Sequence, residues 1–317
     1  MELTAWKRNF TNELVDLWNQ QLGESFPMRH ELFEQNSFND INICWESSKI
    51  ALDNAGKVVG FITVKRYQDN LDISMPIKTG WIQAIVVDST SQNRGIGSNL
   101  LQQAEAMLER KGMEKILLGR DTYHYFPGVP HACGKAGEWF LSKGYEKQTT
   151  DHDLLNSYEN EKTGEYPTFN EVECTILKET ESDSLLHFLN RCFPGRWEYE
   201  AVKYFQSGGT GREFMVMKKQ GEIIGFCRIN DSKSPFIAQN VYWAPLFKEE
   251  LGGIGPLGVD RAERGQGLGL AIIEAGIAEL RQRGSSQIVI DWTDLVQFYQ
   301  KLGYNIWKSY DSYQKVL

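Results

Sequence analysis

Residues 260–270 read Asp260-Arg-Ala-Glu-Arg-Gly-Gln-Gly-Leu-Gly-Leu270 and follow an apolar segment that ends at Val259. Two glycines one residue apart let the backbone turn sharply and let a ligand approach the main-chain amides. The helix that is expected to begin here has no acidic residue in its first turn, so its dipole adds to the positive character of those amides. The stretch therefore predicts a strand–loop–helix turn that binds an anionic group such as a pyrophosphate.

The first half of the chain repeats this pattern. Three segments of the first half match three segments of the second half in the same order, which indicates a tandem repeat. The first match is Gly56-Lys-Val-Val-Gly-Phe-Ile-Thr-Val64 with Gly221-Glu-Ile-Ile-Gly-Phe-Cys-Arg-Ile229, and the second is Val87-Asp88 followed by Gly95-Ile-Gly97 with Val259-Asp260 followed by Gly267-Leu-Gly269. The third is Phe140-Leu-Ser-Lys-Gly-Tyr145 with Tyr299-Gln-Lys-Leu-Gly-Tyr304. The loops that contain the paired glycines read Gln92-Asn-Arg-Gly95-Ile-Gly97 and Arg264-Gly-Gln-Gly267-Leu-Gly269.

The length of the chain agrees with two domains. Its 317 residues are about twice a common domain size, so two hydrophobic cores are expected. Polar residues, Gly and Pro crowd between Asn156 and Thr168, where the apolar periodicity lapses. We therefore predict one domain over residues 1–158 and a second over 170–317. The first half carries an aromatic insertion at 123–130, interpreted as a packed loop or as a lid over a substrate.

Apolar periodicity predicts a mixed α/β arrangement in each half, with helices that cover a sheet. One helix is expected over 95–111 in the first half. In the second half we expect strands at 172–178, 213–219, 222–230, 254–260 and 286–292, helices near 181–192, 197–207, 267–283 and 294–302, and a closing pair of strands.

The composition excludes several classes of function. A net charge of −8 with no run of Lys or Arg disfavours nucleic acid as a partner. No stretch approaches the roughly 18 apolar residues of a membrane span, and the start of the sequence lacks the apolar run of a secretory signal, so we expect a cytosolic protein without a membrane partner. The five cysteines are scattered, and no metal site is expected.

The repeated loop resembles the pyrophosphate-binding signature of GNAT acetyltransferases, Gln/Arg-x-x-Gly-x-Gly/Ala. Phe298-Tyr-Gln-Lys-Leu-Gly-Tyr304 is similar to the ending of that family's last helix. The resemblance implies two tandem GNAT folds, each a mixed, mostly antiparallel twisted sheet flanked by helices, and acetyl-CoA as cofactor. Carried over by motif, the expected cofactor-binding residues are Leu257, Gly258, Val259, Arg264, Gly265, Gln266, Gly267, Leu268, Gly269 and Leu270, with Ile85, Val86, Val87, Gln92, Asn93, Arg94, Gly95, Ile96, Gly97 and Ser98 in the first half.

Acetyl transfer to an amine also needs a base and an acid. An amine with a pKa near 10 is only about 0.1% neutral at pH 7, a penalty of roughly 4 kcal/mol that a base or a desolvating pocket reduces. The resemblance implies that Tyr299 protonates the leaving thiolate, while the first half has Phe140 at that place. Asp291, at the end of its strand, is the nearest candidate base, and an ordinary solvated carboxylate is the alternative. Trp292 stands where the family usually has Asn.

These residues predict an N-acetyltransferase that acts on a primary amine of a small molecule, with catalysis in the second half and a first half that is catalytically silent. Two alternatives stay open from the sequence. The protein could bind acetyl-CoA as a sensor or scaffold without catalysis, or it could acetylate proteins. Tyr299 favours the enzyme, although an aromatic residue packed at a helix end is its other interpretation. The acceptor and the oligomeric state are not specified by the sequence.

Overall fold

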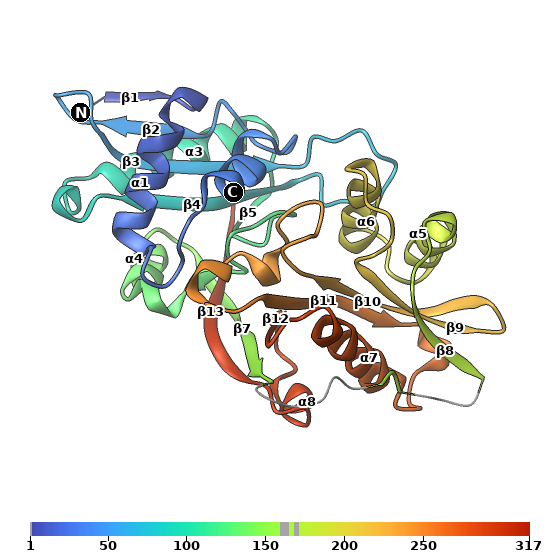
Figure 1. Cartoon of the computed structure of the whole chain (residues 1–317). Helices are drawn as coiled ribbons and strands as arrows, with labels where there is room; N and C mark the ends of the chain where they lie inside the picture. The colour runs from blue at the N-terminus through green and yellow to red at the C-terminus, as the bar shows by residue number, and fades with distance from the viewer. Residues whose placement is uncertain (1, 159–164, 168–170) are drawn as a thin grey trace. The chain divides into compact units, whose positions relative to one another are not determined.

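The computed structural model describes residues 2–158, 165–167 and 171–317. It divides the chain into two compact units (Figure 1). Unit 1 comprises residues 1–70, 76–151 and 308–317, and unit 2 comprises 71–75 and 152–307. Most of the predicted linker between the halves lies outside the described residues.

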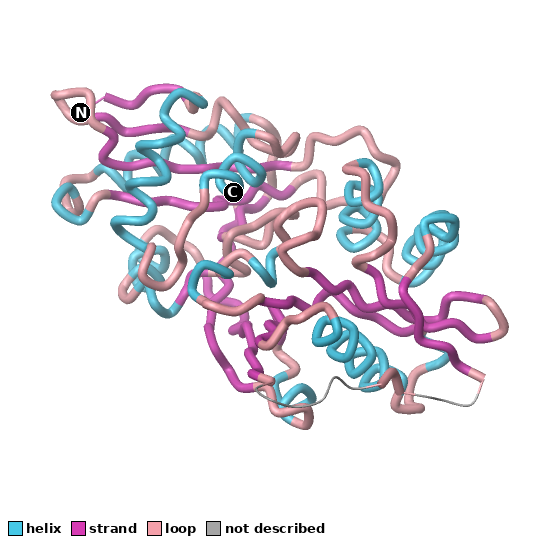
Figure 2. The backbone as a smooth tube through the Cα atoms, viewed as in Figure 1, coloured by secondary structure: helices cyan, strands magenta, loops and turns pink. Residues whose placement is uncertain are grey.

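Unit 1 contains a sheet with the strand order β1-β2-β3-β4-β5-β13, in which only the β4–β5 pair is parallel. Its elements are β1 (Glu2–Ala5), α1 (Thr11–Leu22), α2 (His30–Phe33), β2 (Lys49–Leu52), β3 (Val58–Arg66), β4 (Thr79–Val87), α3 (Ile96–Arg110), β5 (Lys115–Leu118), β6 (Val129–Pro130), α4 (Ala136–Ser142), the first part of β7 (Glu146–Ser157) and most of β13 (Asn305–Val316). Figure 2 shows that much of the chain between β5 and α4 is loop.

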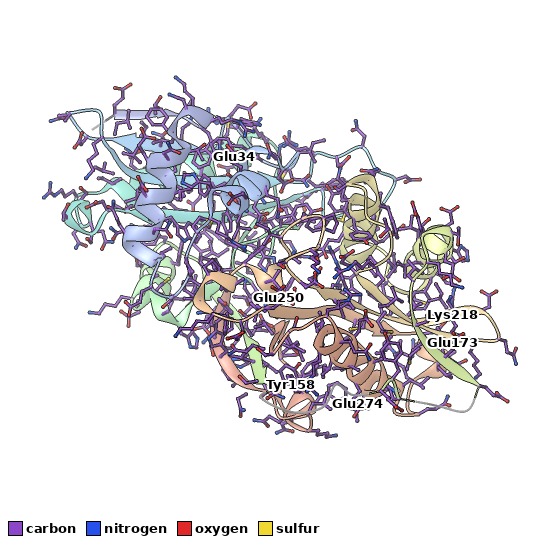
Figure 3. All side chains as sticks on the ribbon, in the orientation of Figure 1. Glu34, Tyr158, Glu173, Lys218, Glu250 and Glu274 are labelled. Carbon is purple, nitrogen blue, oxygen red and sulfur yellow. The ribbon has the colours of Figure 1, made fainter. Side chains whose placement is uncertain are left out.

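Unit 2 repeats this plan with the order β8-β9-β10-β11-β12-β7, in which only the β11–β12 pair is parallel. Across the β8–β9 pair, Glu173 lies opposite Lys218 (Figure 3). The remaining elements of this unit are β8 (Val172–Ile176), α5 (Ser182–Cys192), α6 (Arg196–Gln206), β9 (Phe214–Lys219), β10 (Glu222–Asn230), β11 (Leu251–Val259), α7 (Leu268–Gln282), β12 (Gln287–Thr293) and α8 (Val296–Gln300).

Alternating side chains of β9 build two cores on opposite faces of the unit 2 sheet. Met215 and Met217 pack with the apolar face of α7, whereas Phe214 and Val216 pack with residues of α5 and α6. Successive side chains of a strand point to opposite faces, so the sheet must be covered on both sides. Figure 1 shows α7 on one side of these strands and α5 and α6 on the other.

The mixed, mostly antiparallel fold predicted for both halves is confirmed. The end of each half, however, exchanges partners. From His152 onward, β7 pairs with β12 in unit 2, while β13 pairs with β5 in unit 1. The compact units thus differ from the sequence halves 1–158 and 170–317 in which terminal strand each contains.

Two predicted boundaries differ from the structure. Residues 305–316 form one continuous strand and not the expected closing pair of strands. The reason is that this segment contains no Gly or Pro that would turn the chain. The strand expected at 254–260 begins at Leu251, where three glycines between 252 and 255 hide the strand pattern. Among the described residues, no helix is long and apolar enough to span a membrane.

Candidate active site

In unit 2 the glycine-rich turn has the geometry of an anion cradle. Asp260 accepts a hydrogen bond from the amide of Ala262 (2.9 Å), and Nε of Arg264 donates to the carbonyl of Val259 (3.0 Å), which fixes the loop after β11. Gly267 has φ 82° and precedes the first residue of α7. A Cβ at Gly267 would meet nothing within 4 Å, so the space beside the helix start is open to a ligand.

Unit 1 reproduces this turn. Asp88 accepts from the amide of Thr90 (2.9 Å), Nε2 of Gln92 donates to the carbonyl of Val87 (3.1 Å), and Gly95 has φ 82° before α3. Asn93 stands at φ 59° where the second unit has Gly265 at φ 85°. Asn tolerates this left-handed conformation better than most residues, which explains why the two loops share one shape despite different sequences.

Beside each turn, two parallel strands separate. In unit 2 the pairing of β11 with β12 runs to Ile254 opposite Ile290, and β11 then continues to Val259 paired with β10 alone. In unit 1 the pairing of β4 with β5 runs to Ile82 opposite Leu118. The predicted cofactor strand segments, 257–259 and 85–87, therefore lie just beyond the points where the parallel pairs end.

Asp291 is the first residue of β12 beyond the parallel pairing. Its Oδ1 accepts a hydrogen bond from Nδ2 of Asn240 (3.2 Å), which also donates to the carbonyl of Gly255 (3.2 Å). Desolvation, with the nearby charge of Asp153, raises the pKa of Asp291 to about 7. A carboxylate with such a pKa is half ionised at neutral pH and is suited to accept a proton from a substrate.

Gly255 leaves the room that this carboxylate occupies. Its φ is 136°, in a region that side chains avoid, and a Cβ on it would lie 2.8 Å from Oδ1 of Asp291. The conformational freedom of glycine and the close approach of the carboxylate are therefore both required at this position.

Tyr299 lies in α8 and is 5% exposed. Its ring packs edge-on against Phe298 and Tyr304, with centroid separations of 5.1 Å and 6.4 Å. Burial, followed by the charges of Cys227, Asp291 and Asp294, raises the pKa of Tyr299. The phenol therefore keeps its proton at neutral pH, as a general acid must, and Tyr299 and Asp291 lie within electrostatic range of each other.

Unit 1 lacks both groups at the corresponding places. Its last helix, α4, carries Phe140 in a similar edge-on cluster with Trp139 and Tyr145. Beyond Leu118, where the parallel pairing ends, stands Gly119 in place of a carboxylate. A Cβ at Gly119 would lie 2.1 Å from the carbonyl oxygen of Phe126, so this backbone cannot accept an aspartate there.

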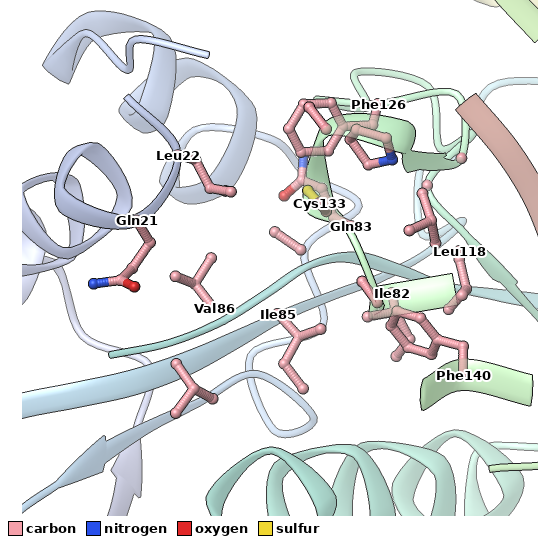
Figure 4. Close-up of a pocket in the computed structure, with 18 of the residues that line it drawn as sticks. Gln21, Leu22, Ile82, Gln83, Ile85, Val86, Leu118, Phe126, Cys133 and Phe140 are labelled. Carbon is pink, nitrogen blue, oxygen red and sulfur yellow. The ribbon is translucent and has the colours of Figure 1, made fainter. Parts of the chain in front are cut away.

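Two cavities open on unit 1 around the separated strands. One, of about 570 Å³, is lined by the turn from Gln92 to Ser98 and by α4. The other, of about 450 Å³, extends toward α1 and β5 (Figure 4). They share the residues Ile85, Val87, Gln92, Cys133, Ala136 and Phe140.

Comparison with known proteins decides the family. A model of the acetyltransferase (GNAT) family matches residues 11–125 and 182–304, once in each half of the chain. The chain belongs to this family. Each half of this GNAT protein therefore contains a match to the family.

Its relatives and structural neighbours share either part of its sequence or its fold. Mycothiol acetyltransferase of Thermobispora bispora is 30% identical over 129 residues, which is 36% of this chain and 37% of that protein. The chain thus spans little more than a third of that relative's length. A GCN5-related glucosamine N-acetyltransferase region of a fungal multi-domain β-N-acetylglucosaminidase has a TM-score of 0.83 at 22% identity, covering 99% of this chain and 38% of that one. A tandem GNAT protein from clavulanic acid biosynthesis has a TM-score of 0.69 at 12% identity, covering 99% and 98%.

The GNAT family generally uses acetyl-CoA, and the turn of unit 2 fits its pyrophosphate. Beside the open space at Gly267, the helix start and the exposed cation of Arg264 would supply amides and charge for the phosphates. The residues that would hold the cofactor are those carried over from the motif, from Leu257 to Val259 and from Arg264 to Leu270.

We predict that Gly267→Asp and Gly269→Asp each lower the affinity for acetyl-CoA at least about tenfold. The new carboxylate would occupy the position of a phosphate, and the hydrogen bonds between that phosphate and the main-chain amides would be lost. Both variants should fold, because a Cβ at Gly269 would come no nearer than 4.0 Å, to Phe298, and a Cβ at Gly267 would meet nothing within 4 Å. The φ of 82° at Gly267 makes a side chain there cost some stability. Gly284→Asp is a matched control: Gly284 follows the same helix, has φ 99° and also faces open space. The measurement is calorimetry on the full chain, in which the additional substitution Gly95→Asp weakens the turn of unit 1 so that binding to unit 2 is observed. Unchanged affinity for acetyl-CoA in both variants would show that the turn of unit 2 is not part of the cofactor site.

Asn240 is the part of this site that the sequence did not reveal. It lies in a short 3-10 turn before β11, and its Oδ1 accepts from Nδ2 of Asn230 (3.1 Å). That bond orients the amide so that its NH2 group faces Asp291. No motif connects these three polar residues, which only the folded sheet brings together.

Proposed function

We propose that this protein transfers the acetyl group of acetyl-CoA to a primary amine of a small molecule, and that unit 2 performs the reaction. One observation carries the proposal: a carboxylate with a pKa of about 7 stands where the parallel strands of unit 2 separate, and one of these strands, β11, continues from there to the amide-rich turn. Unit 1 has the turn but has glycine at that place.

The roles of the residues follow from their protonation. Acetyl-CoA, when bound, supplies the acetyl group as a thioester. An ionised Asp291 accepts the proton of the attacking amine, which lowers the cost of forming the neutral nucleophile. Tyr299 holds a proton on Oη that it can donate to the departing sulfur. Asn240 keeps Asp291 oriented through the 3.2 Å hydrogen bond.

The surroundings of Asp291 favour a cationic acceptor. Asp153 and Glu200 both contribute negative charge that raises the pKa of Asp291. Arg196, paired with Glu200 (2.8 Å), offsets part of this charge and leaves that of Asp153. An ammonium group entering here gains electrostatic attraction to the ionised Asp291. The name of the partial relatives, mycothiol acetyltransferase, supports a small metabolite as acceptor.

The test is acetylation by the full-length chain of a panel of primary amines: an aliphatic monoamine, an amino sugar, an amino thiol, an amino acid ester and a lysine peptide. We expect acetyl-CoA-dependent product, identified by mass, with at least one small amine and a lower rate with the peptide. Acetylation of the peptide alone would replace the small-molecule acceptor by a protein, and thermal stabilisation by acetyl-CoA with no product on any amine would favour a binding role.

A further inference from the structure

The second cavity of unit 1 is uncharged. We name the other cavity, of about 570 Å³, the cofactor-side cavity, because the turn that begins at Gln92 lines it. Apart from the residues that the two cavities share, the lining of the second cavity includes Trp18, Leu22, Ala84, Val86, Leu118 and Phe126 (Figure 4). No Asp, Glu, Lys, Arg or His is among the described residues that line it. We name this space of about 450 Å³ the apolar cavity.

The polar groups of the lining do not favour a charged ligand either. Nε1 of Trp18 already donates to the carbonyl of Phe26 (2.8 Å). Gln83 donates its amide hydrogens to the carbonyls of Asn36 (3.1 Å) and Tyr123 (2.9 Å). Its Oε1 is buried without a donor, so a carboxylate placed nearby would meet an acceptor and no cation. An ammonium would meet no anion, and the cavity therefore suits a neutral, mainly apolar group.

The apolar cavity adjoins the cofactor-side cavity, because the two share lining residues. Ile85 and Val87 of the separated strand, Cys133 and Phe140 line both. A molecule whose phosphates lie on the turn from Gln92 to Ser98 could thus extend between β4 and β5 into the apolar cavity. An acetyl group ends in a single methyl, which is small beside a cavity of about 450 Å³.

We propose that unit 1 binds a coenzyme A thioester with an acyl chain longer than acetyl, the chain occupying the apolar cavity. Gly119 and Phe140 provide neither base nor acid there, so the thioester is bound and not consumed. This proposal rests on the proposed function only in that both require recognition of coenzyme A. Its test measures binding to unit 1, so the result does not depend on whether unit 2 is catalytically active.

The experiment measures binding by calorimetry on the full chain carrying Gly267→Asp, which weakens the unit 2 turn. Coenzyme A, acetyl-CoA, butanoyl-CoA and hexanoyl-CoA are compared. Burial of a methylene in an apolar site predicts an affinity gain of about fourfold for each CH2 added beyond acetyl. Equal affinities for acetyl-CoA and hexanoyl-CoA would overturn the proposal.

Filling the cavity locates the acyl chain. Ala84→Phe should abolish the gain with chain length while changing the affinity for acetyl-CoA less than about threefold. Leu22→Trp, at the half-buried end of α1, should do the same and serves as a second variant in case Ala84→Phe does not fold. Gly95→Asp should weaken binding of all four ligands. A chain-length gain that survives in both folded filling variants, or in Gly95→Asp, would place the acyl chain elsewhere and contradict the proposal.

Discussion

Asp291→Asn is expected to lower the turnover of acetyl transfer by about 10²- to 10⁴-fold, which is the range for loss of a general base. The substitution keeps the shape of the side chain, and the new amide can still offer its oxygen to Asn240. Because a base must be ionised, the wild-type kcat/KM should rise about tenfold per pH unit up to about pH 7 and level off above it, where Asp291 is deprotonated. Asp291→Asn should lose this inflection.

The melting temperature, measured at several pH values, checks that the Asp291→Asn variant folds. Folding raises the pKa of Asp291 to about 7, so the folded state binds its proton more tightly than the unfolded chain does. Ionisation of Asp291 therefore reduces stability as pH rises from about 4 to about 7. At pH 8 Asp291→Asn should melt no lower than the wild type. Glu274→Gln, at an exposed carboxylate of α7, is the control and should keep full activity. Full activity in a folded Asp291→Asn variant would leave unit 2 without a base.

Tyr299→Phe is expected to lower turnover by about 10²-fold and to leave cofactor affinity little changed. Phe140 of unit 1 shows that an aromatic cluster of this kind packs without the hydroxyl, so the ring contacts with Phe298 and Tyr304 should persist. The variant thus removes the proton donor alone.

The pH dependence separates catalysis from packing. Water and buffer acids also protonate a thiolate, so the defect of Tyr299→Phe should be smallest near pH 6 and grow toward pH 9. Turnover close to that of the wild type across this range would remove Tyr299 from the mechanism. The matched control, Tyr304→Phe, loses a buried hydroxyl that contacts Tyr158 (3.4 Å), and should lower stability without this pH-dependent loss.

The fold was predictable from the sequence because its signals are local. Strands, helices and both glycine turns follow from apolar periodicity and from glycine at positions such as Gly95 and Gly267, which the structure places at φ 82°. The exchange of β7 and β13 between units was not predictable, because a strand pattern indicates a buried face and does not identify the neighbouring strand.

The candidate site was predictable only in part. The sequence marked Asp291 by its place at a strand end, but not the desolvation that raises its pKa or the hydrogen bond from Asn240, which comes from a distant turn. The apolar cavity likewise depends on residues from α1, β4, β5 and the 119–135 loop, which have no common motif. Both the environment of Asp291 and the apolar cavity are formed by residues that are far apart in the sequence, so no local sequence pattern could reveal them.

Release of free coenzyme A thiol from acetyl-CoA, in the presence of an acceptor amine, tests the central claim most directly when Gly95→Asp and Gly267→Asp are compared. The two glycines occupy the same place in their turns, with equal φ and open space beside each, so the substitutions disturb the two units alike. At subsaturating acetyl-CoA we expect Gly267→Asp to lower the rate of thiol release at least about tenfold, and Gly95→Asp to retain it within about threefold. The reverse ranking, with activity lost in Gly95→Asp and kept in Gly267→Asp, would contradict catalysis in unit 2.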